Sequence, residues 1–143
     1  MKTRRWLEHG ALLTLGLVFA AAGILKVADP VGFADAVYRY RMLSWTPSLV
    51  LAVYLPWLEL VASLALLSAQ LRRPAVALLA GLCVVFLVVQ GLAKARGLEL
   101  TCGCFGGSGG GGGDLGWSIL RDLALLALAL AYLGSTARTG ARR

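Results

Sequence analysis

The stretch from Ala75 to Ala93 reads AVALLAGLCVVFLVVQGLA and contains no charged residue. The arginine pair Arg72-Arg73 stands just before it, and Lys94 follows it directly. An uncharged run of about 20 residues, bounded by basic side chains, has the length of a helix that crosses the ~30 Å hydrocarbon core of a bilayer. The stretch therefore predicts a transmembrane helix.

The composition of the whole chain points the same way. Of its 143 residues, 59% are hydrophobic and 15% are charged, whereas soluble domains have about 45–50% apolar and 25% charged residues. A net charge of +7 would also suit a nucleic-acid-binding protein. The basic residues, however, stand at the edges of the apolar runs, where they are typical of topology signals and of contacts with lipid headgroups. We expect an integral membrane protein with membrane lipid, and no nucleic acid, as its partner.

Long apolar runs along the chain predict spans at about residues 8–27, 47–70, 75–95 and 117–135. The first run resembles a signal peptide, but it stays apolar to Leu25, so we interpret it as a span. Residues 31–45 mix aromatic and basic side chains, which is typical of a segment at the membrane interface. The expected fold is all-α, with residues 1–143 forming one four-helix membrane bundle and an interfacial segment between helices 1 and 2.

Four spans place both termini on one side of the membrane. The basic residues on that side are Lys2, Arg4, Arg5, Arg72, Arg73, Arg138, Arg142 and Arg143. Those on the other side are fewer: Lys26, Arg39, Arg41, Lys94, Arg96 and Arg121. The excess of basic residues predicts cytoplasmic termini in a bacterial inner membrane. The loop between the last two spans then faces the oxidising exterior.

That outward loop carries Cys102-Gly103-Cys104, a close pair of thiols. Glycine permits the turn that a disulfide between them needs, but so small a ring stabilises a fold little. Thiol–disulfide exchange, a structural bridge or idle thiols, and Cu(I) binding all remain open. No resident metal is expected, because a closed zinc site needs four ligands and the single histidine, His9, lies at the opposite end of the first span.

The third cysteine, Cys83, lies within an apolar run and is expected to be a small buried hydrophobic residue. The chain therefore has no second cysteine pair that could carry electrons across the bilayer. If Cys102 and Cys104 turn over, their electrons must pass to a lipid-soluble carrier such as a quinone, or to another protein.

Glu59 is an acidic residue deep within the second predicted span. Because a charge there is costly, it marks either a functional site or a structural ion pair, and its candidate partners are Lys26, Lys94 and Arg121. The adjacent pair Arg121-Asp122 has two interpretations as well. It is a solvated helix start with its acid near the N-terminus, or Arg121 stabilises a nearby thiolate.

Several motifs together resemble the methylamine utilisation protein MauE family of small four-helix membrane proteins, which is similar to the DoxX-like group. They occur in the family's order over nearly the whole chain: Gly23–Pro30, Phe33, Tyr40–Leu43, Leu55–Leu60, Arg96-Gly97-Leu98, Cys102–Gly106 and Arg121-Asp122. Two departures are Ser44, where a proline is expected, and the glycine-rich run Gly109–Gly113.

The resemblance implies a role beside a periplasmic thioredoxin-like protein, MauD, in maturing the disulfide-rich small subunit of methylamine dehydrogenase. It implies Cys102 and Cys104 as the redox pair. The residues expected around them are Lys26, Glu59 and Arg121, near which a quinone would bind, with Tyr40, Phe105 and Asp122 in support.

The functional hypothesis is a membrane thiol–disulfide oxidoreductase that exchanges electrons between an extracytoplasmic thioredoxin-like partner and a quinone or other membrane carrier. The alternative is a non-catalytic assembly factor or subunit in which Cys102 and Cys104 form a local bridge.

Overall fold

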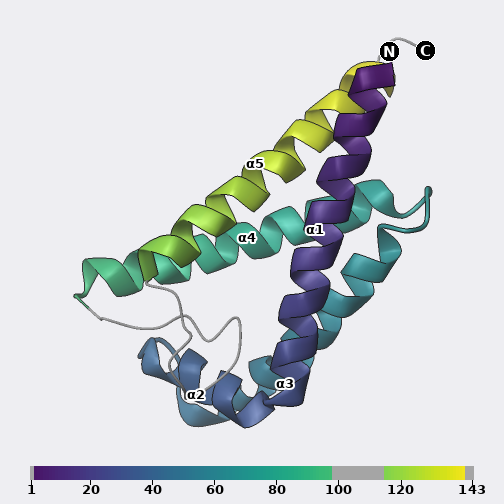
Figure 1. Ribbon diagram of the computed structural model, residues 1–143. Coiled ribbons are helices and arrows are strands. Elements are labelled where there is room, and N and C mark those ends of the chain that lie inside the picture. The colour runs from purple at the N-terminus through teal and green to yellow at the C-terminus, as the bar shows by residue number, and fades with distance from the viewer. Residues whose placement is uncertain (1, 98–114, 141–143) are drawn as a thin grey trace.

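The computed structural model describes residues 2–97 and 115–140, and these ranges contain helices joined by short turns, with no strand. Figure 1 shows their arrangement. The helices are α1 (Lys2–Ala28), α2 (Pro30–Arg39), α3 (Trp45–Ala65), α4 (Arg72–Ala95) and α5 (Leu115–Gly140). Cys102, Cys104 and Phe105 lie outside the described residues.

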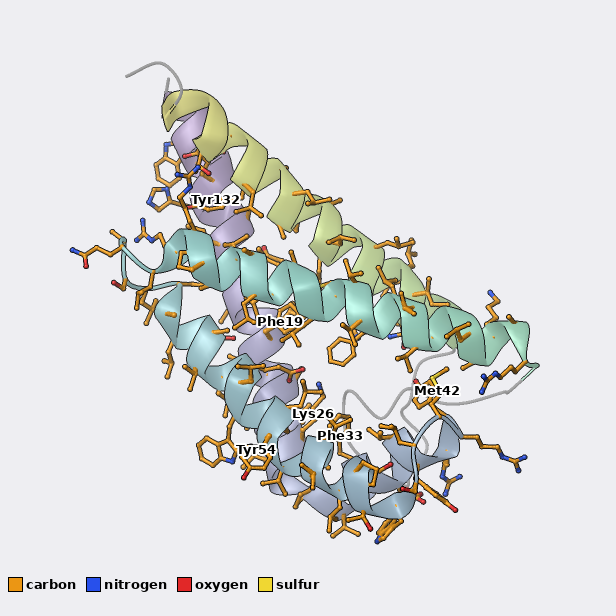
Figure 2. All side chains as sticks on the ribbon, turned by 180° about the vertical axis from the view of Figure 1, so that it is seen from behind. Phe19, Lys26, Phe33, Met42, Tyr54 and Tyr132 are labelled. Atoms are coloured by element: carbon orange, nitrogen blue, oxygen red, sulfur yellow. The ribbon has the colours of Figure 1, made fainter. Side chains whose placement is uncertain are left out.

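Four of the described helices are long and apolar enough to cross a membrane. The spanning segments are Glu8–Ala28, Trp45–Ala65, Arg72–Ala95 and Gly116–Thr136. Their outer faces carry large apolar side chains, such as Leu17, Tyr54 and Val88, that are more than half exposed. Figure 2 shows Tyr54 on the outside of the bundle. Lipid accommodates such faces, whereas water would penalise them. The predicted class, an all-α membrane bundle, is confirmed.

The corner between α3 and α4 lies earlier than the sequence suggested. Helix α3 ends at Ala65 rather than near residue 70, and α4 begins at Arg72. The chain between them closes through short-range backbone bonds, and Arg72 Nε donates to the Leu66 carbonyl oxygen at 3.0 Å. Pro74 falls in the first turn of α4, where no helical partner is needed for its missing N–H.

Helix α2 is the segment expected at the interface, and at 10 residues it extends only about 15 Å, too short to span. Asp29 caps its N-terminus by accepting from the Gly32 N–H at 2.9 Å, and Pro30 occupies the first turn. Phe33 and Ala34 are buried and pack with Ala52 of α3. The ring of Tyr38 in α2 meets that of Trp45, the first residue of α3, edge to face at a centroid distance of 5.7 Å.

Helix α1 packs along α3 and helix α4 along α5. Helix α1 approaches α3 closely at Gly23, where a Cβ atom would stand 2.9 Å from Leu60 Cγ and 3.2 Å from the Pro56 carbonyl oxygen. At the far end, Ser135 Oγ donates to Glu8 Oε1 at 3.1 Å. The two chain ends therefore lie together at one end of the bundle (Figure 1).

Candidate functional site

A fully buried ion pair joins α1 to α3. Lys26 Nζ lies 2.6 Å from Glu59 Oε1, and the side chains are 1% and 0% exposed. Local spacing explains the contact. Lys26 is three residues after Gly23 and Glu59 is three residues after Pro56, so each lies on the helix face where α1 and α3 approach closely. The structure thus pairs Glu59 with Lys26. Lys94, another candidate partner of Glu59, is exposed on α4.

Two aromatic rings flank the Lys26 ammonium. Its Nζ atom lies 5.0 Å from the ring centroid of Phe33 on α2 and 5.0 Å from that of Phe86 on α4. Figure 2 shows Lys26 and Phe33 next to one another. Cation–π attraction partly replaces the hydration that the ammonium loses on burial. Lys26 therefore contacts three other helices of the bundle through one charged group.

A second buried polar group joins α4 to α5. Asp122 Oδ2 accepts from Gln90 Nε2 at 2.7 Å, and Asp122 Oδ1 accepts from Arg121 Nε and Nη2 at 3.0 and 2.9 Å. Asp122 and Gln90 are 3% and 2% exposed. Arg121 keeps 20% of its side chain exposed. Both carboxylate oxygens of Asp122 are therefore satisfied within the bundle.

The two polar groups face one small common space. Lys26, Glu59, Arg121 and Asp122 line a void of about 10 Å³, together with apolar residues that include Phe86. The four charges balance, two positive against two negative. We call these four residues with Gln90 the charge cluster. Such a void is roughly the size of one water molecule and too small for a ring.

Two oxygen atoms of the charge cluster, Glu59 Oε2 and Gln90 Oε1, have no hydrogen-bond partner among the described residues. A buried acceptor left in this way costs about 1–3 kcal/mol. A water molecule in the void would serve Glu59 Oε2. The orientation of the Gln90 amide follows from its neighbour, because only its NH₂ can donate to the Asp122 carboxylate.

A larger cavity of about 160 Å³ lies beside the charge cluster. Helix α2, the following turn, α3 and α4 line it, and Tyr40, 8% exposed, is part of its wall. Phe86 borders both this cavity and the small void. We call it the apolar cavity, because Gln90 is the one amide among otherwise hydrocarbon and aromatic side chains.

The structure brings together four of the site residues predicted from sequence: Lys26, Glu59, Arg121 and Asp122. Sequence reasoning missed Gln90 and Phe86 as members of the site. For Gln90 a signal existed, since an amide within an apolar span usually hydrogen-bonds to another helix. For Phe86 there was none, because phenylalanine is ordinary in such a run.

Neither Cys83 nor the other possible metal ligands among the described residues form a further candidate site. Cys83 is fully buried in the hydrophobic core with Leu79 and Ala129, and its thiol is unpaired. Within residues 2–97 and 115–140, no three His, Cys, Asp or Glu side chains come close enough to hold a metal ion.

The family model for "Methylamine utilisation protein MauE" matches residues 4–135 of this chain. The chain belongs to the MauE family. This confirms the resemblance on which the sequence motifs converged. It also sets the charge cluster and the apolar cavity within a MauE-family bundle.

Two curated MauE proteins are similar to the chain. One, from Paracoccus denitrificans, is 34% identical over 119 residues, covering 82% of this chain and 63% of the relative. The other, from Methylophilus methylotrophus, is 36% identical over 95 residues, covering 66% of this chain and 50% of the relative. The chain thus spans between half and two thirds of the relatives' length. No solved structure matches it.

Proposed function

We propose that this MauE-family chain is a membrane thiol–disulfide redox protein. Its Cys102 and Cys104 exchange electrons with an exported thioredoxin-like partner on one side and with a quinone or another membrane carrier on the other. The supporting observation is the charge cluster: a buried, charge-balanced group of ionisable residues in an apolar bundle is costly and is by default functional. The loop that carries the two cysteines connects α4 and α5, the helices that supply Gln90, Arg121 and Asp122.

The exchange balances in electrons and protons. A Cys102–Cys104 disulfide takes two electrons and two protons from the dithiol of the partner, through a mixed disulfide that the second cysteine resolves. The partner leaves as a disulfide. Reoxidation of the Cys102/Cys104 dithiol releases two electrons and two protons, the number that turns a quinone into its quinol. The same steps reversed would reduce the partner.

The setting proposed for this exchange is a bacterial inner membrane with cytoplasmic termini. The chain ends share one end of the bundle, and the excess of basic residues is on that side. The exported substrate that we propose for this chain, as a member of the MauE family, is the disulfide-rich small subunit of methylamine dehydrogenase.

A non-catalytic assembly factor is the rival function. The rival is favoured by the Lys26–Glu59 and Gln90–Asp122 contacts, because buried polar contacts that join helices can serve packing alone. In that case Cys102 and Cys104 would form only a local bridge.

Replacing Cys102 and Cys104 together by serine separates the two functions. We expect methylamine-dependent growth and the disulfide content of the exported small subunit to fall to the vector-only level, in a host lacking its own MauE gene. Cys83→Ala is the matched control and should retain function, because Cys83 lies in the apolar core. Full activity of the double variant, at equal amounts of protein in the membrane, would support the rival.

A further inference from the structure

The apolar cavity has the size of a single ring. Its volume is about 160 Å³, and an apolar protein cavity of roughly 150 Å³ is known to hold benzene. By contrast, the void inside the charge cluster is about 10 Å³. A ring-shaped ligand therefore fits beside the charge cluster rather than among Lys26, Glu59 and Arg121, where the sequence placed it.

The apolar cavity opens towards lipid. Three residues that line it are partly exposed. They are Leu43 in the turn after α2 (39%), Leu51 in α3 (40%) and Val85 in α4 (56%). A ligand would therefore enter sideways from the bilayer. Its ring would be enclosed, and any long apolar tail would remain among the lipid chains.

The surroundings of the apolar cavity favour a ring that carries oxygen atoms. Phe33 and Phe86 form part of its wall, and the Lys26 Nζ atom lies 5.0 Å from the centroid of each ring. Among the described residues Lys26 donates one hydrogen bond, to Glu59, and so has N–H groups left for a carbonyl oxygen. Gln90 Oε1 is an acceptor without a partner, suited to a hydroxyl. A quinone offers the carbonyl and its quinol offers the hydroxyl.

We propose that the apolar cavity is the headgroup site of a lipid-soluble quinone, with Gln90 in its wall and Phe86 between the ring and the Lys26 ammonium. The identity of the ligand rests on the proposed function, which requires a two-electron carrier in the membrane. The position of the site rests on the cavity's volume, its lining and the unpartnered oxygen atom Gln90 Oε1. Phe86 is the one described residue that lines both spaces, so its rotation would connect the ring with Lys26.

Direct binding tests the site without any turnover. The probe is decyl-ubiquinone, titrated by equilibrium dialysis against the purified full chain in lipid nanodiscs. Val89 lines the apolar cavity, and Val89→Phe should weaken binding by at least about tenfold, because the new ring takes the volume that the headgroup needs. Val88→Phe is the matched control: its neighbour Val88 is 55% exposed, so binding should stay within about twofold. Ala36→Leu, which fills the same cavity from α2, replaces Val89→Phe if that variant does not fold.

The binding results decide on the quinone site and distinguish its failure from failure of the proposed function. Saturable binding that the cavity-filling variant alone weakens, and that decanol does not displace, supports the site. Equal loss in Val88→Phe and Val89→Phe, displacement by decanol, or no saturable binding overturns it. The Cys102→Ser/Cys104→Ser variant should bind as the parent does. If binding persists while the cysteines prove inert, the site stands and the proposed function fails; if binding is absent while the cysteines are active, the carrier is a protein and only the site fails.

Discussion

Replacing Lys26 by methionine is expected to destabilise the bundle by about 3–5 kcal/mol, because the Glu59 carboxylate is then left buried without its cation. Glu59→Leu should cost a similar amount by leaving the Lys26 ammonium unpaired. The measurement is the free energy of unfolding from reversible SDS titration in mixed micelles, followed by loss of helicity.

The double variant Lys26→Met/Glu59→Leu should recover most of the lost stability, since two apolar side chains replace the pair and need no partner. Lys94→Met is the control, and it should change stability by less than about 0.5 kcal/mol because Lys94 is exposed. If the single changes each cost under about 1 kcal/mol, or their effects simply add in the double variant, the pair is not a buried coupled unit.

Asp122→Asn is the second large effect, with an expected cost of about 2–3 kcal/mol. The asparagine carbonyl can accept from Arg121 or from Gln90, but its NH₂ group then faces the other donor. The cost should stay below that of Lys26→Met, because Arg121 is 20% exposed and retains some access to the polar interface. The same SDS titration measures it.

The exposed pair of Asp35 and Arg39 provides the matched control for this change. Its side chains are 45% and 66% exposed at an Nε–Oδ2 distance of 2.8 Å, so Asp35→Asn should cost no more than about 0.5 kcal/mol. In a double-mutant cycle, Gln90→Leu and Asp122→Asn should be coupled. Independent effects of these two changes would mean that the amide and the carboxylate do not act together.

The transmembrane helices could be predicted from sequence because length and hydropathy suffice for that purpose. The end of α3 could not. Leu66, Leu67 and Leu71 continue the apolar pattern past Ala65. The corner includes backbone turn bonds and the bond from Arg72 Nε to the Leu66 carbonyl oxygen, which the pattern does not contain.

The charge cluster was predictable in its members but not in its pairing. A carboxylate within a span indicates that a partner is present. From sequence, however, Lys26, Lys94 and Arg121 were equivalent candidates for the partner of Glu59. The structure selects Lys26, because α1 and α3 approach each other closely at Gly23. The apolar cavity could not be foreseen either, because it arises between α4 and the helix α2 that packs on α3. The chemistry of Cys102 and Cys104 stays a prediction from sequence.

The most direct measurement is thiol trapping in membrane vesicles that contain the full chain with Cys83→Ala. The quinone pool is set oxidised or reduced, the vesicles are quenched in acid, and free thiols are tagged with a mass label. We expect no tags on Cys102 and Cys104 when the quinone pool is oxidised and two tags when the quinone pool is reduced. The same number of tags in both conditions would contradict electron exchange between this cysteine pair and the membrane quinone.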